Sequence, residues 1–224
     1  MVGHSGYHPG MRIVLVTAVI VLLALPAPAE VKVEKAEPTV EYKEFDPKKP
    51  PVLDPPFKPG EAAACLYRFE VDADVAFATR PRRAVPGTKG EPPVDVVISG
   101  LTVRLKLAIT IWLPTGATDR LKEHEEGHRR LAEAYYAKAE AIAKAQAAKV
   151  DGKKFVAAGL EKAKAEITAM NKTVCDGYLE AINRPCDVAQ KVFDELTDHG
   201  VKKSPTTDEG VKLALEAAEK SEKK

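Results

Sequence analysis

The first half of the chain alternates between apolar and polar residues, whereas the second half has helical periodicity. From Val103 to Leu113 every second residue is a large aliphatic one, and this alternation predicts a half-buried strand. The earlier segment from Cys65 to Ala78, CLYRFEVDADVAFA, mixes aromatic and β-branched residues, as strands do. The two segments together predict a small antiparallel sheet.

From Thr118 onward the spacing of apolar residues indicates helices. Thr118 is a suitable N-cap, and the first helix is expected to continue as far as Asp151. A second helix is predicted over 153–171 and a third over 173–197, in which Pro185 is a point where the helix can break. The predicted fold class is therefore α+β, a small antiparallel sheet followed by three helices, the first of them long.

The N-terminus has the pattern of an export signal. Met11 and Arg12 precede about thirteen apolar residues, IVLVTAVIVLLAL, and then comes the small-residue site Ala27-Pro28-Ala29. The apolar run is shorter than the roughly 20 residues of a membrane-spanning helix. Residues 1–29 are therefore predicted to be a signal peptide of an exported protein, periplasmic or extracellular. An uncleaved N-terminal anchor is the alternative, and it is the one contact with a membrane that the sequence suggests.

The rest of the chain divides by composition. Residues 30–60 are rich in proline, which predicts an extended leader or linker. Residues 61–200 carry the predicted sheet and helices and form the expected catalytic domain. Residues 201–224 are highly charged and are expected to be a frayed tail.

Export would place the three cysteines in an oxidising compartment. Cys175 and Cys186 are near one another in sequence, so they form the favoured disulfide, which leaves Cys65 free. A bridge from Cys65 to either of the others stays open as an alternative.

The charge balance argues against nucleic acid as a partner. The chain has 34 Lys and Arg against 33 Asp and Glu, so no strongly basic face is implied. Aromatic residues make up 6% of the chain, which is little for a surface on which bases stack.

The stretch RLKEHEEGHRR, residues 120–130, carries the candidate chemistry. His124 and His128 are four apart, so on a helix both imidazoles project from one side and can bind one Zn²⁺. Glu125 can then reach a water on the metal and act as general base, as in H-E-x-x-H zinc peptidases. Gly127 lowers helix propensity, which suggests the close approach of another group. The alternative is structural, because Leu131 lies on the same stripe and the histidines can be core residues.

Two histidines leave a third zinc ligand to be found. The metzincin continuation is excluded, because Leu131 and Ala134 occupy the positions where it needs glycine and histidine. His199 is one candidate, although a histidine at a helix end also serves to satisfy the last carbonyls. Carboxylates on later helices are the others: Glu161, Glu166, Glu180 and Glu195.

A second motif, Phe193-Asp194-Glu195-Leu196-Thr197-Asp198-His199-Gly200, follows the HEEGH helix. Together with the leader peptide and the strand that ends at Trp112, the two motifs resemble a family of predicted secreted bacterial zinc-dependent proteases, formerly a domain of unknown function. The similarity covers about residues 60–200.

This resemblance implies a zincin-like fold in which His124, His128 and His199 bind zinc and Glu125 is the general base. Asp194 would then orient a ligand imidazole, although Asp194 or Glu195 can also be the third ligand. The family pattern places a tyrosine before the aspartate, where this chain has phenylalanine. A hydroxyl for the transition state would therefore have to come from another tyrosine: Tyr135, Tyr136 or Tyr178.

The sequence thus predicts an exported zinc metallopeptidase that acts on a peptide or protein substrate. The rival hypothesis is an exported helical binding or scaffold protein, or a zinc-binding relative without activity. Substrate preference and oligomeric state do not follow from the sequence.

Overall fold

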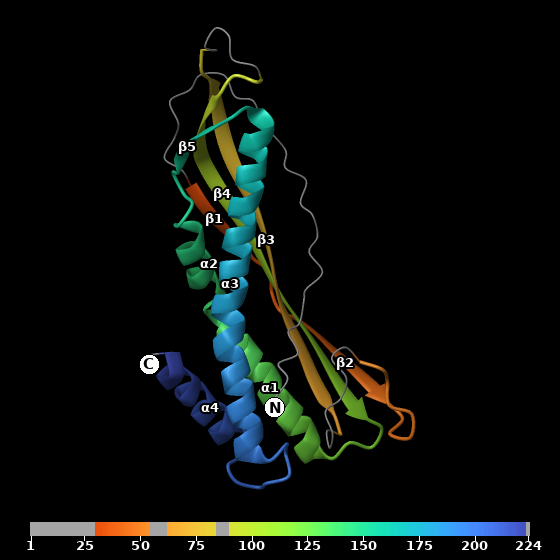
Figure 1. The fold of residues 1–224 in the computed structure, drawn as a ribbon. Helices are drawn as coiled ribbons and strands as arrows, with labels where there is room; N and C mark the ends of the chain where they lie inside the picture. The colour runs from red at the N-terminus through yellow and green to blue at the C-terminus, as the bar shows by residue number, and fades with distance from the viewer. Residues whose placement is uncertain (1–29, 54–61, 84–89, 223–224) are drawn as a thin grey trace, which may run out of the picture.

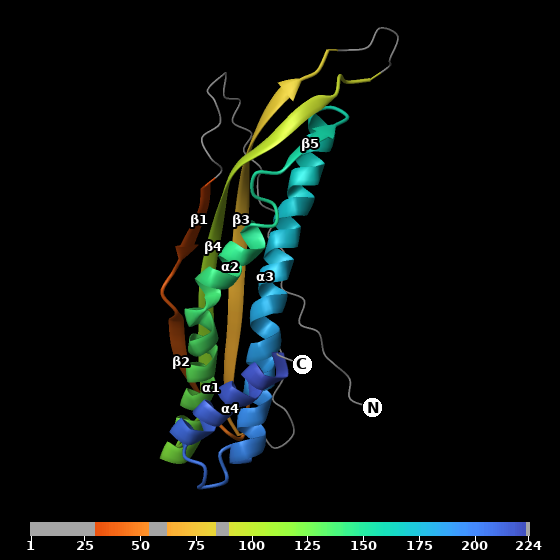
Figure 2. The same cartoon turned by 90° about the vertical axis from the view of Figure 1, so that its left-hand side faces the viewer.

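The computed structural model describes residues 30–53, 62–83 and 90–222, so the predicted signal peptide lies outside the described residues. The helices α1, α2 and α3 pack on one face of a single sheet, and α4 packs on α1 and α3 (Figures 1 and 2). The bounds of the helices are α1 Asp119–Ala137, α2 Ala139–Ala147, α3 Leu160–Thr197 and α4 Thr207–Glu222.

The sheet is mixed, so the predicted small antiparallel sheet is wrong, although the α+β class holds. Its strands are β1 Glu30–Lys35, β2 Thr39–Phe45, β3 Ala64–Pro81, β4 Val94–Pro114 and β5 Lys154–Ala157. β3 pairs antiparallel with β4 along almost its whole length. β1, β2 and β5 therefore share the opposite edge of β4, where β1 and β2 run parallel to it and β5 runs antiparallel.

The parallel strands come from the segment that was expected to be a leader or linker. Val33 of β1 faces Val103 of β4, and Tyr42 of β2 faces Ile111. The prolines of residues 30–60 lie outside both strands: Pro38 falls between β1 and β2, and the others follow Phe45, the last residue of β2. Both are also edge strands, the position in a sheet that tolerates neighbouring prolines.

The helix boundaries also differ from the prediction. The expected first helix is divided at Lys138, whose N–H bonds to the carbonyl of Tyr135 three residues back. The expected second and third helices are one continuous helix, α3, about 57 Å long at 1.5 Å per residue. Pro185 does not break α3, because Ile182 and Cys186 on either side of it are fully buried and hold the helix in place. The C-terminal tail contains α4.

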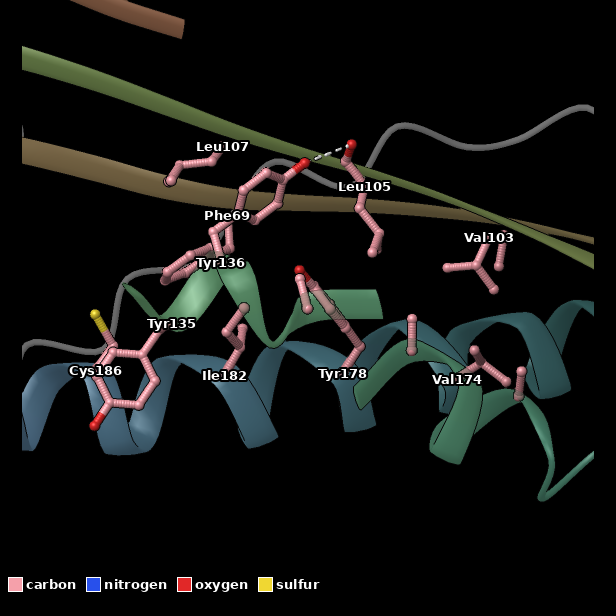
Figure 3. Close-up of a cluster of buried hydrophobic side chains, with 14 of the residues drawn as sticks. Phe69, Val103, Leu105, Leu107, Tyr135, Tyr136, Val174, Tyr178, Ile182 and Cys186 are labelled. Carbon is pink, nitrogen blue, oxygen red and sulfur yellow. Dashed lines mark hydrogen bonds between the residues drawn. The ribbon is translucent and has the colours of Figure 1, made fainter. Parts of the chain in front are cut away.

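The core lies between β4 and the helices. The alternation predicted from the sequence is confirmed, since the odd-numbered residues of β4 from Leu101 to Ile111 are buried. Tyr136 of α1 reaches from the helix to the sheet, where its hydroxyl bonds to the carbonyl oxygen of Leu105 at 2.9 Å (Figure 3). Tyr178 of α3 packs beside it, and its burial raises the pKa of its phenol. These contacts fix α1 and α3 side by side on the sheet.

The predicted disulfide between Cys175 and Cys186 is wrong, because all three cysteines are free. Both residues lie on α3 eleven positions apart, which separates them by roughly 16 Å along the helix axis. A disulfide needs Cα atoms within about 7 Å of each other.

Among the described residues, no helix carries an apolar stretch long enough to cross a bilayer.

Candidate metal centre

His124, His128 and Asp194 meet where the first half of α1 crosses the last turns of α3. His128 Nε2 lies 3.1 Å from His124 Nε2 and 3.0 Å from Asp194 Oδ1, and His124 Nε2 lies 3.4 Å from the same oxygen. Within the part of the chain that the structure describes, this is the group of His, Cys, Asp and Glu side chains whose geometry can hold a metal ion.

The spacing of the three atoms fits a tetrahedral metal. With bonds of about 2.0–2.1 Å, two ligand atoms of a tetrahedral zinc site are about 3.3 Å apart. The three observed separations lie between 3.0 and 3.4 Å, so one ion can bond to all three atoms. Three protein ligands leave a fourth tetrahedral position for water or substrate, which distinguishes catalytic zinc sites from closed structural ones.

Hydrogen bonds on the far side of each imidazole set the protonation of its nitrogens. The hydroxyl of Thr197 donates to the carbonyl of Phe193 at 2.7 Å, so it accepts from Nδ1–H of His124 at 3.3 Å. The amide nitrogen of Gln190 donates to the carbonyl of His128 at 3.1 Å, which turns the amide oxygen to His128 Nδ1 at 2.5 Å. Both histidines therefore carry a proton on Nδ1, and Nε2 is the ring nitrogen that faces Asp194 and, once deprotonated, can bind a metal ion.

Polar side chains are concentrated at this point. Tyrosine and cysteine apart, four polar or charged side chains of the described residues are buried, and all four are cluster members or act on them: His124, Glu125, Gln190 and Thr197. Burial of such groups is costly unless each is paired, and their gathering in one place is compatible with a bound metal ion.

The ionisation of the cluster follows from burial and from the Asp194 charge. Burial favours the neutral form of His124 and lowers its pKa. Burial acts in the same direction on His128, but the hydrogen bond to Asp194 and the charges of Asp194 and Glu125 outweigh it, so the pKa of His128 is raised. Burial alone would raise the pKa of Asp194, yet hydrogen bonds from both imidazoles hold it well below its ordinary value. Asp194 is therefore a carboxylate, ready to bind a cation.

Gly127 makes room for the ring that supports both ligands. A Cβ at this position would overlap the tip of the Phe193 ring, which stacks on His124 with ring centroids 5.1 Å apart. The same ring meets His128 edge-on at 5.0 Å. The close approach that Gly127 suggested in the sequence is therefore the approach of Phe193.

The Gly127→Ala variant is expected to lose zinc affinity and stability together. The added methyl group must displace Phe193, and overpacking of this kind costs about 1–3 kcal/mol, more than the gain in helix propensity from alanine. Displacement of the ring also frees both imidazoles, so zinc affinity should fall at least about tenfold, as for the loss of an outer-shell partner. Urea unfolding and a competitive zinc titration measure the two effects.

Gly177→Ala is the matched control within α3. Its new Cβ would lie 2.6 Å from Oε1 of Gln146, the end of a flexible side chain that can turn aside. This variant should therefore bind zinc as the wild type does and gain up to about 1 kcal/mol from helix propensity. Equal zinc affinity and equal unfolding free energy in the two variants would show that the Phe193 ring does not support the site.

His199 lies beside the cluster and not within it. Its Nδ1 is 3.4 Å from Asp194 Oδ1, and its side chain is 53% exposed. Asp198 and His199 both have φ of 50°, a left-handed conformation that is costly for residues other than glycine. Arg120 holds this turn by donating to the carbonyl of Gly200 at 2.7 Å. The assignment of His199 as third ligand stays a prediction, whereas Oδ1 of Asp194 lies within the cluster of possible ligand atoms.

Glu125 lies on the inner side of α1, toward the sheet. Its side chain is 4% exposed, and its negative charge contributes to the raised pKa values of both His128 and Cys65. Glu125 is therefore a buried carboxylate of α1 close enough to His128 and Cys65 for its charge to act on both.

Four glutamates and two tyrosines nominated by the sequence lie away from the centre. Glu180, the nearest of the three glutamates earlier on α3, is fourteen positions before Asp194, or about 21 Å along the axis. Glu195 points to solvent and pairs with Lys191. Tyr178 is about 24 Å before Asp194 on α3, and Tyr136 is bonded to the backbone of β4, so neither can supply a hydroxyl to the site.

Gln190 and Thr197 bond to the two imidazoles of the candidate centre, and sequence reasoning does not find them. The spacing Gln190, Phe193, Asp194, Thr197 places all four on one face of a helix, and this was the signal that could have found them.

Comparison of the chain with protein-family models, curated proteins and solved structures finds no match.

Proposed function

We propose that the chain is a zinc-dependent peptidase of the kind predicted from its sequence, exported from the cytoplasm. The observation that carries the proposal is the spacing of three ligand atoms on His124, His128 and Asp194, which matches a tetrahedral metal with one open position. Two imidazoles and one carboxylate form a donor set that zinc accepts in hydrolytic enzymes. The H-E-x-x-H spacing adds a carboxylate, Glu125, directly beside the first ligand.

The roles of the chain's own residues follow from their contacts. A zinc ion held by His124, His128 and Asp194 would lower the pKa of a bound water to about 7 and would polarise the substrate carbonyl. Glu125 would accept the proton that the attacking water loses and would deliver it to the amine that leaves. Thr197 and Gln190 keep the two Nε2 lone pairs directed at the metal. Phe193 excludes water from the far side of the imidazoles.

The test begins with the metal content of the chain from Glu30, purified without a histidine tag or chelators. Elemental analysis should find one zinc per chain, and the zinc-loaded protein should hydrolyse an unfolded protein such as β-casein. His128→Ala should retain neither zinc nor activity, because it removes a ligand that two other groups orient. Zinc without hydrolysis would indicate a zinc-binding relative without activity, and no zinc at all would indicate the helical binding or scaffold protein.

The affinity of the chain for zinc should depend on pH. The pKa of His128 is raised above its ordinary value near 6.5, so a proton competes with zinc for Nε2 as the pH falls toward and below neutrality. The carboxylate of Asp194 takes up no proton in this range, because its pKa is held well below the ordinary value. Zinc affinity should therefore decrease as the pH falls from 8 to 6, which isothermal titration in buffers of different ionisation enthalpy can measure.

A further inference from the structure

The end of the sheet farthest from the candidate metal centre is formed by the end of β3, the start of β4 and the short strand β5 (Figures 1 and 2). α3 begins there, and its first residue, Leu160, is about 51 Å from Asp194 along the helix axis. Residues 78–83, 90–97 and 149–157 are called the distal end below. This surface is therefore separate from the metal centre.

The distal end is basic, although the charges of the whole chain nearly cancel. Its three segments contain six Lys and Arg against three Asp and Glu. Two of the three carboxylates are bonded within the protein. Glu91 accepts a hydrogen bond from the backbone N–H of Leu160 at 3.0 Å, and Asp95 accepts one from Nε of Arg82 at 2.8 Å. The third acidic residue, Asp151, has its Oδ1 atom buried.

Most of the basic side chains at this end are exposed and unpaired. In the part of the chain that the structure describes, four of them take part in no ion pair: Arg80, Arg83, Lys153 and Lys154. Their positive charges are therefore available to an anionic partner.

Exposed apolar side chains lie among these basic groups. Val94 and Val96 of β4 are buried on the face that α3 covers, so Asp95 and Val97 point to the opposite face of the sheet. In the strand register Arg80 and Val156 flank Asp95, whereas Ala78 and Lys154 flank Val97. Residues directly opposite each other share a face, and the side chain of Val156 is 47% exposed. The outer face of the distal end thus combines basic residues with an apolar strip.

The course of β1 relates this end to the start of the chain. Glu30, the first residue of β1, faces Gly100 of β4, and β1 runs parallel to β4 from there, away from the distal end. The chain therefore enters β1 from the distal side. In the sequence, the apolar run IVLVTAVIVLLAL is separated from Glu30 by the four residues Pro26 to Ala29. A membrane that takes up this run is therefore close to the distal end.

We propose that the distal end docks on the surface of a bilayer that contains anionic lipids. The lipid phosphates attract the unpaired Lys and Arg side chains, and the apolar strip around Val156 enters the boundary between headgroups and acyl chains. Charge complementarity and the direction in which the chain enters β1 both favour this partner. The proposal does not depend on the peptidase function, and it places the metal centre about 50 Å from the lipid.

The test measures co-sedimentation of the chain from Glu30, which contains every described helix and strand, with lipid vesicles. The chain should bind vesicles of phosphatidylcholine and phosphatidylglycerol but not vesicles of phosphatidylcholine alone, and salt should weaken the binding by screening. The triple variant Arg80→Gln, Arg83→Gln, Lys154→Gln should bind about 100-fold more weakly, because each basic residue near an anionic surface contributes about fivefold.

The matched control removes three exposed lysines at the opposite end of the molecule: Lys122→Gln, Lys202→Gln, Lys203→Gln. It changes the net charge of the chain by the same amount, but it should bind the anionic vesicles within about twofold of the parent, since these side chains lie beyond the reach of the surface potential. Thermal unfolding establishes that both triple variants are folded.

Two results would overturn the proposal directly: an equal loss of binding in the two triple variants, or a parent chain that does not bind anionic vesicles. A soluble polyanion is the other possible partner, and Val156→Trp separates it from a lipid surface. This substitution should strengthen binding to anionic vesicles, because tryptophan favours the bilayer interface, and leave binding of polyphosphate unchanged. If Val156→Trp does not strengthen vesicle binding while polyphosphate binds the parent tightly, the distal end recognises a polyanion and not a membrane.

Discussion

Glu125→Gln is expected to lower the rate of peptide-bond hydrolysis by about 10³-fold while one zinc per chain stays bound. Loss of a positioned general base typically costs 10²–10⁴-fold. The amide has the shape of the carboxylate and can still occupy its buried position, but it cannot take a proton from water at neutral pH. Glu125 has no atom in the ligand cluster, so zinc should remain. The measurements are kcat on β-casein fragments and zinc content of the same sample.

Glu126→Gln is the neighbouring control. Glu126 accepts hydrogen bonds from Tyr42 at 2.6 Å and from Arg129 at 2.5 Å, on the side of α1 that faces β2. Its loss should change kcat by no more than about twofold, because surface pairs of this type contribute little. Wild-type turnover in Glu125→Gln would contradict the proposed mechanism, even with zinc in place.

Asp194→Asn is expected to weaken zinc binding by more than about 100-fold, whereas His199→Ala should change it by less than about threefold. The first substitution removes the negative charge and a ligand atom that lies 3.0 and 3.4 Å from the two Nε2 atoms. Loss of an outer-shell partner already costs 10–100-fold, so loss of a ligand should exceed this range. His199 contacts the cluster at 3.4 Å from a half-exposed position, which is consistent with a role beside the metal. Competition with a chromogenic chelator measures both affinities.

The reverse order of the two effects would establish the ligand set predicted from the sequence, with His199 as third ligand and Asp194 as its orienting carboxylate. Asp198→Ala is a useful control for the turn, because Asp198 shares its left-handed conformation with His199 but has no atom in the cluster. Its affinity for zinc should match that of the wild type. A large loss in this variant would mean that the backbone of the turn, and not the His199 side chain, determines binding.

The parts of the site that could be predicted from sequence are those within one turn of a helix. His124, Glu125 and His128 are close in the chain, so their relative positions follow from helical geometry alone. Gln190 is 62 residues from His128 and Thr197 is 73 residues from His124, and no local rule brings such residues together. Asp194 belongs to a motif visible in the sequence, but its place among the ligand atoms depends on how α3 packs against α1.

In the fold, too, local features could be predicted from the sequence and long-range contacts could not. Alternation in the sequence determined that the odd-numbered residues of β4 are buried, and the N-cap Thr118 determined where α1 begins. Only the tertiary structure decided that β1 and β2 lie parallel to β4, that α3 continues through Pro185, and that Asp194 meets His124 and His128. The physical reason is that apolar periodicity and capping depend on residues within one helix or strand. Strand pairing and helix packing depend on which distant element covers that helix or strand.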